Sequence, residues 1–119
     1  MRTIIAGSRD IVDDSLIQAA ITASGFEISC VISGGAKGVD TMAEQWARAQ
    51  GISVAVVLPD WKTYGRGAGP ERNRRMAGQA DALIAIWDGK SRGTRSMIQI
   101  AQKANLKVHV FDPVLRSGA

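Results

Sequence analysis

Three short polar loops carry most of the side chains in this sequence that could do chemistry. They span residues 7–10, 33–40 and 88–94 and are rich in glycine, hydroxyl-bearing and cationic residues. Each loop directly follows an apolar run of the kind that forms a buried strand. Exposed backbone amides, helix N-termini and cations in such positions suit a phosphate group. The sequence therefore predicts a phosphate-binding site assembled from three separate loops.

The glycine loop (residues 33–40) offers two explanations for its composition. Gly34, Gly35 and Gly38 stand between a strand and a helix, so the backbone could approach a phosphate while the helix N-terminus supplies unpaired amides. The loop matches neither GxGxxG nor GxxxxGKS/T, and a tight turn with close helix packing would also need glycine. Lys37 could add a cation or simply be solvated. Asp40 could contact a ribose hydroxyl, although a helix's first turn favours a carboxylate in any case.

A second group of candidates surrounds the helix expected to open at Pro70. Arg72 and Arg75 share one face of that helix, where guanidinium groups suit phosphate, but a solvated cationic helix fits equally well. Ser91 and Thr94 could hold a second phosphate or a carboxylate, or could cap the helix that follows. The same residue types therefore support either a ligand site or ordinary helix chemistry.

The aromatic residues Trp61 and Tyr64 lie in a polar loop that contains glycine rather than on a core stripe. One of them could stack on a base, or they could anchor the loop or contact another subunit. His109 alternates with valines in an apolar run and has no second histidine, so we expect it to be part of a sheet. No metal-ligand cluster is visible, and a metal is expected only as magnesium bound to a phosphate.

Length and composition limit the classes of protein that fit. The chain has 119 residues, 45% hydrophobic and 22% charged, which suits one domain over residues 1–112 with a loose tail over 113–119. Its net charge of +4 is compatible with nucleic acid or another anionic partner. Cys30 is the single cysteine, which excludes an internal disulfide. No stretch nears the roughly 18 apolar residues of a membrane span, so we expect a cytoplasmic protein without membrane contact.

Alternating apolar runs and amphipathic segments predict the elements that position the loops. Strands are expected at residues 3–6, 28–32, 52–58, 82–87 and 108–111. Helices are expected from residue 13 or 14 to 24, from Val39 to a stop at Gly51, at about 70–79 and at about 94–104, with a long loop over 59–69. This alternation predicts an α/β, Rossmann-like three-layer sandwich with a parallel sheet in the order 3-2-1-4-5.

These motifs occur in order along nearly the whole chain and together resemble the SLOG superfamily of small bacterial and phage proteins. The blocks that carry the resemblance are Gly7 to Arg9, Ser33 to Asp40 with Ala43 and Glu44, Asp60 and Trp61, Gly69 to Asn73 with Met76, Ala82 to Ala85, and Trp87 to Thr94. Similar proteins include the DNA-processing protein A fold, the LOG-type cytokinin phosphoribohydrolases and the sensor domains of antiphage systems. The resemblance implies a Rossmann-like nucleotide pocket and a homodimer or larger homo-oligomer.

The sequence matches only one of the two catalytic motifs of the phosphoribohydrolases. Those enzymes use an arginine in a Glu-Arg-Lys-x-x-Met segment, which Arg72 matches here, with Asn73 in place of lysine. They also use a glutamate just after a Gly-Gly-x-Gly-Thr loop, whereas Arg95 follows Gly93 and Thr94 in this chain. The missing carboxylate weakens the enzyme interpretation, because N-glycosidic cleavage needs one. The remaining catalytic candidates are Arg72, Asp88 and Glu44, and Asp10 could also substitute.

The leading hypothesis is a pocket that binds a nucleotide or a nucleotide-derived signal such as an ADP-ribose-type compound or cyclic isomer, with no resident cofactor. The alternatives are a phosphoribohydrolase for a nucleoside monophosphate and a protein that binds single-stranded DNA through its arginines and loop aromatics. The predicted ligand-binding residues are Gly7, Ser8, Arg9, Gly34, Gly35, Ala36, Lys37, Gly38, Asp40, Arg72, Asn73, Asp88, Gly89, Ser91, Gly93 and Thr94.

Overall fold

A parallel five-stranded sheet in the order β3-β2-β1-β4-β5 forms the centre of the molecule, as predicted. The computed structural model describes residues 1–113; the rest of the expected tail, residues 114–119, lies outside this range, and Pro113 is buried. The strands are β1 (Arg2–Gly7), β2 (Cys30–Ser33), β3 (Ser53–Val56), β4 (Ala82–Ile86) and β5 (Lys107–Phe111). In this range no helix is long and apolar enough to cross a membrane.

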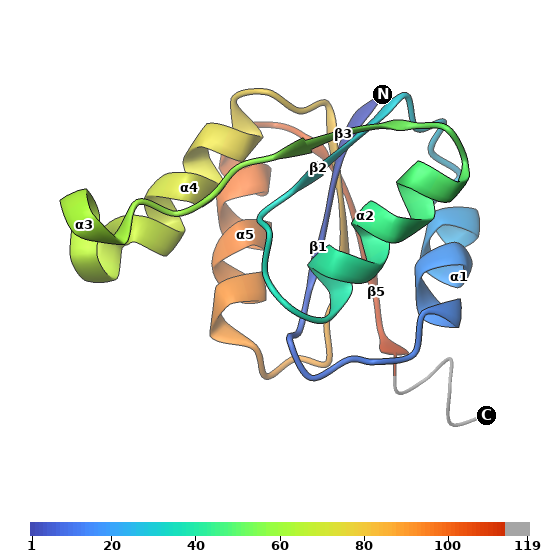
Figure 1. The fold of residues 1–119 in the computed structure, drawn as a ribbon, viewed down its shortest axis with the longest axis horizontal. Helices are drawn as coiled ribbons and strands as arrows, with labels where there is room; N and C mark the ends of the chain where they lie inside the picture. Colours follow the sequence, from blue (N-terminus) through green and yellow to red (C-terminus); the bar gives the residue numbers. More distant parts are fainter. Residues whose placement is uncertain (114–119) are drawn as a thin grey trace.

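Helices cover both faces of the sheet and give the expected three layers (Figure 1). Helices α1 (Ser15–Ser24) and α2 (Val39–Ala49) pack on one face, and α4 (Ala68–Ala77) and α5 (Arg92–Lys103) pack on the other. Successive strand residues point to opposite faces, so Ile5 joins the α1–α2 core whereas Ile4 joins the α4–α5 core. Complete burial of each such side chain contributes roughly 1.5–3 kcal/mol to stability.

The segment expected to be a loop, residues 59–69, is largely helical, and this part of the prediction was wrong. It contains α3 (Trp61–Tyr64), the 3-10 turn η1 (Gly65–Gly67) and the start of α4. The Asp60 carboxylate accepts a hydrogen bond from the Thr63 amide at 3.1 Å and caps α3. Pro70 is the third residue of α4 rather than the first, which is tolerated because first-turn amides have no partner within the helix. Local capping thus outweighs the low helix propensity of the glycines.

Smaller differences concern where elements begin. Strands β2 and β3 are shorter than the apolar runs that predicted them, and α5 starts two residues before the expected position. The Ser91 side chain caps α5 by accepting a hydrogen bond from the Thr94 amide at 3.4 Å. One of the two roles open to Ser91 in the sequence is therefore present in the structure.

Close packing of the glycine loop against the loop after β1 aligns the two segments. Gly38 has φ +76°, and a Cβ atom there would lie 2.5 Å from the Ser8 carbonyl oxygen and 2.7 Å from the Arg9 carbonyl oxygen. The Val39 amide donates to the same Ser8 oxygen at 3.4 Å. Only glycine fits this combination of positive φ and backbone contact.

Replacement of Gly38 by alanine is expected to destabilise the protein more than the same change at Gly51. Gly51 has a similar φ of +71°, but nothing lies within 4 Å of its missing Cβ. Gly51→Ala should therefore cost only the backbone strain, about 1–2 kcal/mol. Gly38→Ala should cost about 1–3 kcal/mol more, because the backbone after β1 must move. Urea unfolding measures both, and equal losses would contradict the packing role of Gly38.

Candidate functional site

A cavity of about 770 Å³ opens beyond the carboxyl ends of β1 and β4. These two strands are neighbours in the middle of the sheet, and their crossover helices pack on opposite faces. Ligands of open α/β sheets bind at such a switch point. The lining residues are Ala6 to Asp10, Ala36, Asp40, Trp61, Gly69, Pro70, Arg72, Asn73, Met76, Asp88, Lys90 to Thr94, Ser96 and Met97.

The cavity brings together most of the residues predicted from sequence to bind a ligand. Those that line it are Gly7, Ser8, Arg9, Ala36, Asp40, Arg72, Asn73, Asp88, Ser91, Gly93 and Thr94. The predicted residues that do not line it are Gly34, Gly35, Lys37, Gly38 and Gly89, and the catalytic candidate Glu44 also lies elsewhere. Whether any of these residues contacts a ligand stays a prediction.

Several lining residues were not singled out as ligand contacts from the sequence. Lys90 and Arg92 flank Ser91 in a loop that had been selected for its other residues, and Arg92 had been considered only as part of a basic surface for single-stranded nucleic acid. Met76 and Met97 add apolar surface, and each stands three residues after a lining polar residue, Asn73 and Thr94. Helical spacing from these neighbours could have identified both methionines.

The N-terminus of α5 presents unpaired backbone amides to the cavity. The Arg95 amide donates to the Ser91 carbonyl at 3.1 Å, and the Thr94 amide is capped by the Ser91 hydroxyl. The amides of Arg92 and Gly93 have no partner within residues 1–113, as expected for the first turn of a helix. The positive end of the helix dipole and these amides together attract an anion.

Hydrogen bonds within the loop before α5 hold its backbone in place. The Asp88 carboxylate accepts from the Lys90 amide at 2.8 Å and from the Ser91 amide at 3.4 Å. The Lys90 amide lowers the pKa of Asp88 below its usual value. The indole of Trp87 donates to the Ser91 carbonyl at 3.0 Å. Asp88 is therefore an ionised carboxylate at neutral pH and cannot donate a proton as a general acid there.

Arg72 extends from α4 to the glycine loop on the opposite side of the cavity. Its guanidinium donates to the Gly34 carbonyl at 2.5 Å and, through Nε, to the Asn73 side chain at 3.0 Å. A Cβ on Gly34 would lie 2.6 Å from Arg72 Nη1 and 2.9 Å from Asp40 Oδ2, so glycine makes room for both charged groups. Burial lowers the pKa of Arg72, and the nearby Asp40 carboxylate partly offsets this effect. Arg72 is a structural bridge as well as part of the cavity wall.

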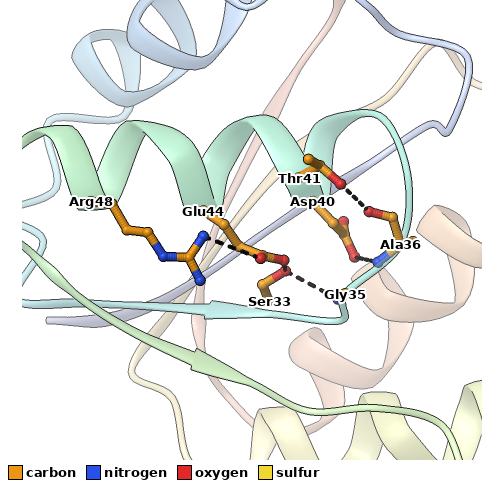
Figure 2. Close-up of polar contacts among 7 residues, drawn as sticks. All are labelled: Ser33, Gly35, Ala36, Asp40, Thr41, Glu44 and Arg48. Atoms are coloured by element: carbon orange, nitrogen blue, oxygen red, sulfur yellow. Dashed lines mark hydrogen bonds and ion pairs between the residues drawn. The ribbon is translucent and has the colours of Figure 1, made fainter.

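Side chains of the glycine loop and of α2 form hydrogen bonds with backbone groups of the same loop, as Figure 2 shows. The Gly35 amide donates to the Ser33 hydroxyl oxygen at 3.1 Å, and the Ala36 amide donates to Asp40 Oδ2 at 3.2 Å. Two amides that were expected to face a phosphate are thus engaged within the protein. The loop positions Asp40 and the neighbouring segment after β1.

Glu44 belongs to this same internal network rather than to the cavity. Its carboxylate accepts a hydrogen bond from the Ser33 hydroxyl at 2.6 Å and lies 3.7 Å from Arg48, one turn further along α2 (Figure 2). These contacts tie α2 to the end of β2. The geometry therefore assigns Glu44 a positioning role behind the glycine loop.

The cations of the cavity differ in how much of their charge is available. Arg9 is exposed and makes no hydrogen bond or ion pair with the described part of the chain, whereas Arg72 is held by Gly34. Lys90 and Arg92 are also exposed at the cavity. Among the described residues that line the cavity, these three cations and the two α5 amides are therefore available to an anion.

The stability contributed by Asp40 should depend on pH. Burial raises the pKa of Asp40 above its usual value of 3.8, and the Ala36 amide and Arg72 only partly oppose this effect. Between pH 3.8 and the raised pKa of the folded state, the folded protein therefore binds more protons than the unfolded chain. The stability of the wild type relative to Asp40→Asn should therefore fall as pH rises from 3.8 through the folded pKa. Thermal melting of both proteins between pH 4 and about pH 7 measures this, and a constant difference would contradict it.

Replacement of Arg72 should lower the free energy of unfolding more than replacement of another arginine on α4. Arg72→Ala leaves the Gly34 carbonyl and the buried Asp40 without their cation, at a cost of about 2–3 kcal/mol. Arg74→Ala removes an exposed side chain and should stay within about 0.5 kcal/mol of the wild type. Chemical denaturation compares the two variants. Equal stabilities would show that the Arg72 bridge carries little energy.

Solved structures share this fold, among them two of DNA processing protein A. DNA processing protein A (DprA) from Streptococcus pneumoniae superposes with a TM-score of 0.73 over 92% of this chain at 20% identity, and the chain spans about half (49%) of that protein's length. DNA processing protein A from Helicobacter pylori, a structure solved to describe its single-stranded DNA binding mode, gives a TM-score of 0.70 over 98% of this chain and 73% of that protein, at 20% identity. At this identity the likeness concerns the fold.

Sequence comparison narrows the relationship further. The chain is 40% identical over 87 residues to the Gene 61 protein of Mycobacterium phage D29, a match that covers 68% of this chain and 70% of the relative. Residues 1–64, which contain β1, α1, β2, α2, β3 and α3, match the family model YAcAr. The five-stranded order, the cavity at its switch point and these two matches agree, and the chain belongs to the YspA, cpYpsA-related SLOG family.

Proposed function

We propose that the cavity binds a nucleotide or a nucleotide-derived small molecule by its phosphate group. The observation that carries the proposal is the convergence of the free α5 amides with Arg9, Lys90 and Arg92 on one cavity of about 770 Å³. Pockets for small molecules commonly measure about 300–1,000 Å³, so a nucleotide fits the available space. Membership of the SLOG family supports the same class of ligand.

The cavity contains residues that could contact the phosphate, the ribose and the base of such a ligand. The phosphate would accept hydrogen bonds from the Arg92 and Gly93 amides, and Arg9 would neutralise its charge. The Asp88 carboxylate keeps capacity to accept a hydrogen bond from a ribose hydroxyl. Trp61 lines the cavity with 58% of its surface exposed, which leaves its ring available to stack on a base. Met76 and Met97 would supply apolar contact beneath the ligand.

Binding without turnover is the form of the proposal that the carboxylates favour. Glu44 lies outside the cavity, and the Asp88 carboxylate already accepts hydrogen bonds from the Lys90 and Ser91 amides. Asp40 lines the cavity but is committed to the Ala36 amide and the Arg72 charge. N-glycosidic cleavage of a nucleoside monophosphate is the alternative, and it would have to use Asp10, Asp40 or Asp88, the carboxylates that line the cavity. Magnesium would enter this site only with the phosphates of a ligand.

Self-association in the cytoplasm of a bacterial or phage-infected cell is part of the same proposal. Val56 at the end of the edge strand β3 and Leu58 two residues later are exposed, at 43% and 62% of their surface. Exposed apolar side chains on an edge strand are suited to contact with a second copy.

Removal of the Arg9 charge should weaken phosphate-dependent binding without unfolding the protein. Thermal shift and calorimetry would use the four nucleoside 5′-monophosphates, ADP-ribose and a cyclic ADP-ribose isomer, each with its phosphate-free nucleoside as a control. Arg9→Gln should lower the affinity of a stabilising phosphate ligand by at least about tenfold, the loss of one charge-assisted hydrogen bond. Arg48→Gln removes an equal charge from α2, away from the cavity, and should leave affinity unchanged.

Three outcomes of this experiment would overturn the proposal or part of it. Equal binding of a nucleotide and its nucleoside would exclude a phosphate site. Equal effects of Arg9→Gln and Arg48→Gln would place the ligand elsewhere. Mass spectrometry of each mixture is the test of turnover, because a released base would make the protein an N-glycosidase.

A further inference from the structure

A second hollow of about 670 Å³ is lined by α4 and α5 and shares only Pro70 and Ser96 with the cavity described so far. Its polar lining comes from Arg74 on α4 and from Ser96, Gln99, Gln102 and Lys103 on α5. We call it the α4–α5 groove. In Figure 1 the two helices lie next to each other on the same face of the sheet.

The groove continues from the nucleotide cavity. Pro70 and Ser96 line both hollows, one from each helix. The groove then extends along α5 from Ser96 to Lys103, seven residues or about 10 Å at the rise of an α-helix. A ligand that fills the cavity near the start of α5 can therefore extend into the groove.

The charge of the groove suits a second anionic group on that ligand. Arg74 and Lys103 are the charged residues in its lining, which contains no carboxylate. Both are exposed, and neither makes a hydrogen bond or ion pair with the rest of residues 1–113. Their neighbour Arg75 differs, because it pairs with Glu71 at 2.7 Å. Gln99 and Gln102 add amide donors and acceptors that can bond to sugar or base edges.

We propose that the α4–α5 groove binds the second phosphate-linked unit of an oligonucleotide whose terminal nucleotide occupies the cavity. The inference rests on the proposed function, because the first unit must sit in the cavity. It names a linear ligand of at least two nucleotides as the preferred class. Arg74 and Lys103 contact the phosphate group or groups beyond the first, and the two glutamines face the attached sugar and base.

The test compares ligands that differ only in length. Calorimetry at low salt would measure the binding of each nucleoside 5′-monophosphate, of the corresponding 5′-phosphorylated dinucleotide and of the single-stranded hexanucleotide, in ribose and deoxyribose forms. The dinucleotide of the preferred base should bind the wild type about tenfold or more tighter than its monomer, since one charge-assisted contact is added. The gain should shrink as salt concentration rises.

A double variant assigns this gain to the groove. Arg74→Gln with Lys103→Gln should abolish the gain from the second unit and leave binding of the monomer within about twofold of the wild type. The matched control, Arg48→Gln with Lys107→Gln, removes the same charge from exposed sites outside both hollows and should keep the full gain. Both pairs are surface changes, so thermal melting should show folded proteins.

Each outcome separates this inference from the function on which it rests. Monomer binding with no gain for the dinucleotide, or a gain that survives in the groove variant, overturns the inference and leaves the proposed function intact. Absence of binding by every monomer and dinucleotide overturns the inference, and the proposed function falls with it only if ADP-ribose and its cyclic isomer also fail to bind. Affinity that levels off at the dinucleotide supports the inference with a short free oligonucleotide as ligand, whereas a further rise with the hexanucleotide supports it with the end of a nucleic acid strand.

Discussion

The bridge from Arg72 to the glycine loop is the interaction on which the cavity depends. Arg72 starts on α4, on one face of the sheet, and donates to the Gly34 carbonyl, where its charge acts on the buried Asp40 at the start of α2, which packs on the other face. The two charges are costly to bury separately, but each lowers the cost of the other. Glycine at position 34 is needed because a Cβ would occupy the space of both groups. The bridge therefore holds two layers of the fold at a fixed separation across the switch point.

The glycine loop and the loops after β1 and β4 therefore have different roles. The glycine loop and its partners use their amides and carboxylates on one another, and Gly38 packs against the backbone after β1. Amides and a cation without partners among the described residues are instead found at the start of α5 and after β1, where Arg9 is exposed. A segment that resembles a phosphate loop by composition can thus serve mainly to position its neighbours, while a loop without consecutive glycines presents the open helix N-terminus.

The relation to glycosidase-type members of the superfamily depends on carboxylates. This chain has Arg72 in a matching segment, yet that arginine is a structural bridge, and Arg95 stands where a catalytic glutamate is expected. Asp88 is held ionised by backbone amides, so it can accept a hydrogen bond or a proton but cannot act as a general acid at neutral pH. In the proposed arrangement, the α4–α5 groove next to the cavity would let the same scaffold distinguish ligands by length, because its two cations, Arg74 on α4 and Lys103 on α5, lie outside the cavity.

The sequence by itself determined the sheet order and the edge at which the site forms. Buried apolar runs separated by amphipathic helices allow few parallel topologies, and the carboxyl ends of such strands always meet at one edge. The prediction of a loop over residues 59–69 was wrong because it relied on the glycine content. It did not consider that Asp60 could cap a helix or that the first turn of a helix accepts Pro70. Only the tertiary structure decided which polar groups remain without a partner. The amides of Gly35 and Ala36 are hydrogen-bonded to the side chains of Ser33 and Asp40. Arg72 is hydrogen-bonded to the Gly34 carbonyl, whereas Arg9 has no partner among the described residues. Composition lists the donors and acceptors, but long-range packing determines which of them already have partners.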